Sequence, residues 1–255
     1  MTDTNKDKNE TAQVDDVNAS AEEQEMTLAQ SVAKNAIGLA LFAFITAGVI
    51  ALTQQTTVEK IDFNIAEAQA KALYEITPKD TVDNDLLNDA YDLYAESAKT
   101  LHNIRLLGPL DKRAMVYFAK LNGQTHTLIY PTVAPDGYTT AIKLLVGVRT
   151  DGTLSGVRIV DHKETPGLGD KIDIKKSDWV IDFEGKSLAL PSIEKWKVQK
   201  DGGDFDQFTG ATITPRAVVN AVKNTLIFHQ ENSDAILKLK QRSDQMQNKT
   251  EEQNK

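Results

Sequence analysis

The chain has 255 residues, 40% of them hydrophobic, and carries a formal net charge of −8 at pH 7, which suits one sizeable folded domain with appendages. The acidic balance argues against sequence-independent nucleic-acid binding, which needs clustered Lys and Arg to neutralise phosphates. The chain has no cysteine, so it can form no disulfide, thiolate zinc site or iron–sulfur cluster of its own, and redox chemistry would need a bound organic cofactor.

The N-terminal part reads as a tail followed by a membrane span. Residues 1–30 are expected to form a disordered tail, because polar and charged side chains dominate them. Residues 31–56 are predicted to form one transmembrane helix, since Ala36–Leu52 gives about 26 Å of uncharged helix. A cleaved signal peptide is the alternative, but the polar leader is too long for one. Lys34 and Lys60 flank the span on opposite sides, so charge leaves its orientation open.

Residues 57–110 are predicted to form a helical linker region. Asn64 and Glu67 have the spacing of a capping box, and the helix that they would start ends before Pro78. The segment Asp83–Arg105 has apolar residues at mixed spacing among acids, and it is predicted to be helical as well.

Residues 111–230 are predicted to form the folded domain, and 231–255 a charged C-terminal tail. From Ala114 apolar residues alternate with polar ones, which indicates strands. Asn122-Gly123 and Asp151-Gly152 each join two such strands in a hairpin. An antiparallel sheet with helices before and after it makes the fold class α+β.

A turn of small and hydroxylated residues, Asp206-Gln207-Phe208-Thr209-Gly210-Ala211-Thr212-Ile213-Thr214-Pro215, leads into the last predicted helix. Thr214 is a good N-cap residue, and Pro215 suits the first helical position. Thr212 would then lie just before the positive end of a helix, where a phosphate is favoured. From these residues alone, an ordinary capped turn before a surface helix is the simpler interpretation.

The same turn resembles the covalent flavin-attachment motif of the FMN-binding subunits of bacterial respiratory complexes. The resemblance implies that FMN is joined through its phosphate to Thr212, with Thr209, Gly210 and Ala211 beside the cofactor. It also implies that Asp206 serves recognition by the flavin transferase that makes the bond. The flanking residues are most similar to the RnfG family, the FMN-carrying components of Rnf (Rsx) ion-translocating electron-transport complexes. The equivalent FMN component of the sodium-translocating NADH:quinone reductase is the second choice.

The segment Glu164-Thr165-Pro166-Gly167-Leu168-Gly169 matches a second signature of these flavin subunits. By itself a Pro-Gly-x-Gly run is only a turn. The resemblance implies polar contacts to the cofactor from Glu164 and Thr165, a close approach of the Gly167-Leu168-Gly169 backbone, Gly169 included, and Leu168 against the flavin ring.

Other candidate site residues are explained more simply. Lys171 could contact FMN, but a solvated lysine after a loop is the simpler interpretation. Trp179, Phe183 and Trp196 are expected in the core, whereas Phe205 and Phe208 could either be core or touch the cofactor. The four histidines lack metal-ligand spacing, so no metal site is predicted.

The resemblance implies a membrane-anchored FMN subunit that passes electrons between the other membrane and iron–sulfur subunits of its complex. It further implies a single-pass protein of the bacterial inner membrane with its C-terminal domain in the periplasm. Such a protein is part of an ion-translocating oxidoreductase without independent catalysis, and the sequence shows no acid–base pair or nucleotide fingerprint against this. A cofactor-free membrane-tethered scaffold is the alternative from another class.

Overall fold

The computed structural model describes residues 28–253, without the side chains of a few residues inside the two long helices. The chain divides into two units, Met1–Phe63 and Asn64–Lys255. The predicted disordered tail falls almost entirely in residues 1–27, which lie outside the described part.

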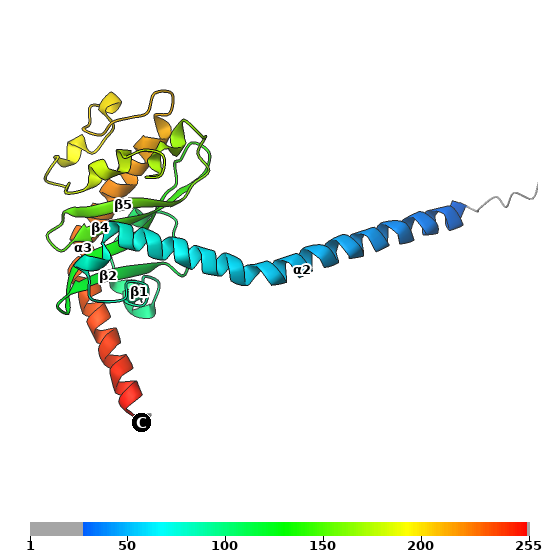
Figure 1. Ribbon diagram of the computed structural model, residues 1–255, viewed down its shortest axis with the longest axis horizontal. Helices are drawn as coiled ribbons and strands as arrows, with labels where there is room; N and C mark the ends of the chain where they lie inside the picture. Colours follow the sequence, from blue (N-terminus) through cyan, green and yellow to red (C-terminus); the bar gives the residue numbers. More distant parts are fainter. Residues whose placement is uncertain (1–27, 254–255) are drawn as a thin grey trace, which may run out of the picture. The chain divides into compact units, whose positions relative to one another are not determined.

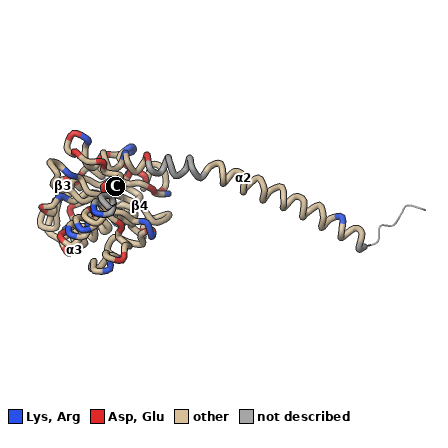
Figure 2. Tube along the Cα trace, turned by 90° about the horizontal axis from the view of Figure 1, so that it is seen from below, with Lys and Arg blue, Asp and Glu red and all other residues tan. Residues whose placement is uncertain are grey.

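Helix α2 (Leu28–Ile76) contains the predicted membrane span. Its stretch Gln30–Thr57 has a mean hydropathy of 2.3 and is the one described segment long and apolar enough to cross a membrane. Figure 2 shows that charged residues are nearly absent from this part of α2. The hydroxyls of Thr46 and Thr53 donate to carbonyls one turn earlier, so these polar groups are satisfied within the helix. This helix fits a single-pass membrane protein.

Helix α2 continues past residue 56, the predicted end of the membrane span. A separate helix capped by Asn64 and Glu67 is wrong, because α2 continues through both positions without a break. Its end is as predicted: the last helical residue is Ile76, and Thr77 precedes Pro78, whose ring disfavours helical backbone in the residue before it.

The predicted antiparallel sheet is confirmed. Its five strands lie in sequence order and every neighbouring pair is antiparallel. Asn122 and Gly123 have φ of 53° and 71°, the left-handed values that a tight two-residue hairpin requires. The strands are β1 (Ala90–Asp92), β2 (Met115–Leu121), β3 (Gln124–Ala134), β4 (Ile142–Arg149) and β5 (Leu154–Asp161).

The helical prediction for Asp83–Arg105 is wrong, since this segment contains β1 and short 3-10 turns. Asn84 explains part of the difference: its amide donates to the Phe118 carbonyl at 2.7 Å and accepts from the Lys120 amide N–H at 2.9 Å. Asn side chains that pair with backbone in this way compete with helix formation, and here they attach the segment to β2.

Helices cover both faces of the sheet (Figure 1). Helix α3 (Ile213–Gln253) packs on one face, where its buried residues include Val218, Val222 and Phe228. The end of α2 packs on the other face through Leu73 and Ile76. Alternate residues of each strand therefore face different helices, as the period of two requires.

The predicted charged tail is largely ordered helix, which corrects the sequence interpretation for residues up to 253. Asn232 exchanges two hydrogen bonds with the backbone of His102, at 2.7 and 3.0 Å. Farther along, Lys240 lies 3.0 Å from Asp89 and 2.5 Å from Asp244. The segment is polar in composition, but one face of its helix is attached to the domain through these contacts.

A cluster of aromatic side chains fills the space beside the start of α3. The rings of Phe183 and Phe205 stack with centroids 4.9 Å apart, and Trp179 meets Phe208 edge-on at 5.2 Å. Trp196 joins the cluster beside Phe205 and is 1% exposed. All five predicted aromatics are therefore core residues.

Candidate functional site

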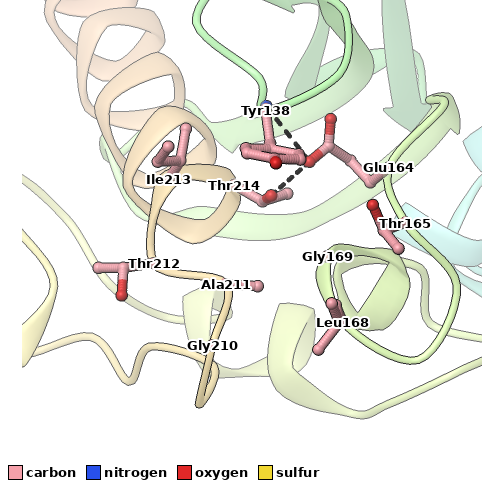
Figure 3. Close-up of a pocket in the computed structure, with 10 residues that line it drawn as sticks. All are labelled: Tyr138, Glu164, Thr165, Leu168, Gly169, Gly210, Ala211, Thr212, Ile213 and Thr214. Atoms are coloured by element: carbon pink, nitrogen blue, oxygen red, sulfur yellow. Dashed lines mark hydrogen bonds between the residues drawn. The ribbon is translucent and has the colours of Figure 1, made fainter.

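A pocket of about 300 Å³ lies where the β3–β4 loop, the segment after β5 and the start of α3 meet (Figure 3). Both sequence signatures contribute to it, although they are far apart along the chain. Its ten lining residues are Tyr138, Glu164, Thr165, Leu168, Gly169, Gly210, Ala211, Thr212, Ile213 and Thr214.

The turn that carries Gly210 is fixed by the aromatic cluster. The Trp179 indole N–H donates to the Asp206 carbonyl at 2.9 Å, and Phe208 is buried. The Ala211 amide donates back to the Phe208 carbonyl at 3.1 Å, which closes the turn. Gly210 has φ of +81°, a conformation that favours glycine. The large aromatics therefore position a turn of small residues at the pocket edge.

Helix α3 begins at Ile213, earlier than predicted, which makes Thr212 rather than Thr214 its N-cap. The Thr212 carbonyl accepts the Arg216 amide N–H at 3.3 Å, the first hydrogen bond of the helix. Pro215 still lies in the first turn, where no N–H partner is needed. Arg216 also pairs with Asp201, with Nε 2.6 Å from the carboxylate. Thr212 is thus placed at the positive end of a long helix.

The hydroxyl of Thr214 donates a hydrogen bond to the carboxylate of Glu164. The same carboxylate accepts the amide N–H groups of Tyr138 at 3.3 Å and Thr139 at 3.0 Å. Glu164 is only 4% exposed, so these bonds replace its hydration. We refer to Glu164, Thr214 and the Tyr138–Thr139 amides as the latch. It joins the three segments that form the pocket.

Gly169 lies directly against the latch. A Cβ atom at this position would come within 2.8 Å of the Thr214 hydroxyl and 3.0 Å of Glu164 Cβ, so no larger residue fits without displacing them. The amides of Leu168 and Gly169 both donate to the Thr165 carbonyl at 3.1 Å, which folds the segment tightly. The requirement for glycine at 169 therefore arises from the latch itself.

Most of the residues suggested by the resemblance meet in this pocket. Thr209 and Asp206 do not line it, and both are exposed on the preceding turn. Lys171 is exposed and also lies outside the lining. Seven predicted residues do line it: Glu164, Thr165, Leu168, Gly169, Gly210, Ala211 and Thr212.

Sequence reasoning missed Tyr138, Ile213 and Thr214 as pocket residues. Ile213 and Thr214 directly follow the attachment motif, so helical geometry could have found them. For Tyr138 the available signal was the Asp136-Gly137 turn before it, which marks a loop between two strands. Nothing in the sequence pairs that loop with Glu164.

The lining suits a phosphorylated, partly aromatic ligand such as FMN. Its volume is at the low end of the range of about 300–1,000 Å³ found for ligand pockets, which fits a cofactor held partly in solvent. Hydroxyls of Thr165 and Thr212 provide polar contacts, and Leu168 and Ile213 provide apolar ones. The carboxylate of Glu164 is occupied by the latch hydrogen bonds. The favourable electrostatic potential for a phosphate comes from the N-terminus of α3.

The fold and the pocket define a class: a membrane-anchored α+β domain that binds FMN. The family of FMN-binding domains matches residues 137–227, which include the whole pocket. A second family, described as the RnfG N-terminal region, matches residues 26–76, and α2 ends at the last of these.

Comparison with curated proteins identifies the family more closely. The chain is 47% identical over 208 residues to the G component of the ion-translocating oxidoreductase complex of Pseudomonas aeruginosa (strain UCBPP-PA14), covering 82% of this chain and 93% of that protein. It is 41% identical over 207 residues to the protein of the same name in Vibrio atlanticus, covering 81% and 94%. This chain belongs to the RnfG family, the G components of ion-translocating oxidoreductase complexes.

Proposed function

We propose that this chain is the membrane-anchored RnfG component of an Rnf-type ion-translocating complex, and that it carries electrons on an FMN bonded covalently to Thr212. The observation that carries the proposal is the position of Thr212. It is the N-cap of α3, it is part-exposed, and it lies in the pocket that both signatures form. A hydroxyl at this position is accessible to a modifying enzyme and close to backbone N–H groups that favour a phosphate.

The pocket residues have separable roles in this proposal. Thr212 forms the phosphoester, while Gly210 and Ala211 leave room for the phosphate beside the turn. Thr165 offers a polar contact and Leu168 an apolar one, while the Thr209 hydroxyl, outside the lining, helps to position the turn. FMN, when bound, accepts and releases electrons, and the protein contributes position and electrostatics.

The proposed partners follow from the family. They are the other membrane and iron–sulfur subunits of the complex, between which electrons pass, and a flavin transferase that forms the bond. Asp206 is exposed on the turn before the pocket, outside the lining. This position suits recognition by the transferase rather than contact with bound FMN.

The first test is the mass of the protein produced together with the transferase. We expect an FMN-sized addition on the peptide containing Thr212, and its complete loss in Thr212→Ala, which removes the attachment oxygen from a part-exposed position. Thr209→Ala is the matched control, because it deletes the same atoms from the same turn and should retain the addition. Flavin on Thr209, or no flavin despite an active transferase, would refute the assignment.

We also propose that the C-terminal domain lies in the periplasm. The chain has no cysteine, so single cysteines report topology without background. A cysteine replacing the exposed Lys112 should react with a membrane-impermeant reagent in intact cells, whereas one replacing Lys6 should react only after lysis. The opposite labelling pattern would reverse the proposed orientation.

A further inference from the structure

Tyr138 is an exposed aromatic residue at the edge of the pocket. Its side chain lies in the lining with those of Leu168 and Ile213, and the three residues are 65%, 42% and 46% exposed. Within the described part of Asn64–Lys255 these residues add little to the core. Exposed apolar side chains that gather at one pocket are typical of a binding surface.

The backbone of Tyr138 is nevertheless held firmly. The amides of Tyr138 and Thr139 donate to the buried Glu164 carboxylate, as Figure 3 shows for Tyr138. Gly137 adds a second constraint: a Cβ there would collide with the Thr140 carbonyl oxygen, so the loop is folded tightly on itself. The structure thus fixes the backbone under a side chain that the fold itself leaves in solvent.

The latch also relates Tyr138 to the attachment residue. Glu164 binds Thr214, which is two positions after Thr212 in the first turn of α3. One carboxylate therefore fixes both the loop that carries the aromatic ring and the helix start that carries the proposed phosphoester. Displacement of either segment would break hydrogen bonds to a buried charge, which are costly to lose.

We propose that the phenol ring of Tyr138 packs against the isoalloxazine ring of FMN, and that the latch positions it there. This inference rests on the proposed function, because it needs FMN on Thr212. The chemistry is complementary, since the flavin ring is broad, flat and electron-poor and the phenol is electron-rich. Aromatic pairs of this kind favour offset-stacked or edge-to-face contact.

Such contact has a spectroscopic consequence. A phenol that touches an excited flavin donates an electron to it and takes the same electron back, so the emission is lost without net reaction. A phenylalanine ring packs similarly but is too difficult to oxidise to do this. Replacing only the hydroxyl should therefore separate quenching from packing.

The experiment uses the full chain co-produced with the transferase, with loading confirmed by intact mass. We expect flavin emission to rise several-fold in Tyr138→Phe and Tyr138→Leu relative to wild type. Tyr94→Phe is the matched control, because Tyr94 is 45% exposed but lies outside the pocket lining, and its emission should equal that of wild type.

The outcomes discriminate between a contact role and a structural one. Unfolding of the unloaded protein should be unchanged in Tyr138→Phe, because the hydroxyl of this exposed residue supports no fold contact in the described structure. Equal emission from fully loaded wild type and Tyr138→Phe would overturn the inference while leaving the proposed function intact. Absence of FMN from the wild-type chain would overturn both.

Discussion

Replacement of Thr214 by valine tests the latch directly. The change keeps the shape of the side chain and removes the hydroxyl that donates to Glu164. Thr214 is 1% exposed and Glu164 4%, so water cannot readily replace the lost donor. A hydrogen bond to a charged group contributes about 1.5–3 kcal/mol, and we therefore expect the free energy of unfolding to fall by about that amount. A domain of ordinary stability, about 5–15 kcal/mol, stays folded after this loss.

Thr225→Val is the matched control on the same helix. The Thr225 hydroxyl is also buried and bonds to neutral partners, Thr132 Oγ1 at 2.9 Å and the Ala221 carbonyl at 3.0 Å. Its loss should cost about 0.5–1.5 kcal/mol. Because Thr225 is not a pocket residue, covalent loading should be unaffected, whereas Thr214→Val should load more slowly.

The assay combines two measurements on each variant. Urea unfolding of the detergent-solubilised chain can be followed by the emission of its two tryptophans, both of which are buried in the domain. The rate of FMN addition by the transferase is measured by intact mass. Thr214→Ser should restore both values because it restores the hydroxyl. The reasoning fails if Thr214→Val loads at the wild-type rate and is no less stable than Thr225→Val.

Two further predictions concern Gly169 and His229. Gly169→Ala should lower both stability and FMN loading, measured as above, because the added Cβ would meet Thr214 and Glu164. Gly167→Ala is the control: φ at this position is +77°, so the variant is strained, but the surrounding space is open and loading should persist. Burial lowers the pKa of His229 from 6.5 to about 4, so the unfolded chain gains a proton below pH 6.5 that the folded chain resists. The free energy of unfolding should therefore drop by about 2 kcal/mol from pH 7 to pH 5. His229→Gln should flatten this pH dependence. An unchanged pH dependence in that variant would show that other titratable groups cause it.

The sheet was predictable from sequence because its information is local. Asn122-Gly123 determines a hairpin by its own conformational preference, and the flanking runs rich in Val, Ile, Leu and Tyr favour strands. The apolar run at Ala36–Leu52 is equally local. These features need no knowledge of distant partners.

The errors occurred where long-range contacts decide the structure. Asn84 pairs with the backbone of β2, which turns an apparently helical segment into turns and a strand. Lys240 forms a salt bridge with Asp89, which is distant in sequence. This contact anchors a helix whose polar composition suggested a solvated tail. Neither partner can be inferred from the surrounding residues.

The candidate site was predictable only in part, because some of its information is local and some depends on long-range contacts. The two signatures each indicated their own residues, including Thr212 and Leu168, by resemblance. The role of Glu164 in the latch depends on Thr214 and on the loop at Tyr138, which only the fold brings together. The Glu164 carboxylate, expected to contact the cofactor, lines the pocket and also holds its three segments together.

The sequential order of the five strands also bears on when the cofactor can be added. Strands that are neighbours both along the chain and in the sheet form contacts over short loops, which favours rapid folding. The pocket also requires α3 in place, because Thr214 on this helix bonds to Glu164. A transferase that recognises the assembled pocket would modify folded chains and pass over incomplete ones. Cofactor attachment would then also serve as a maturation checkpoint during biogenesis of the complex.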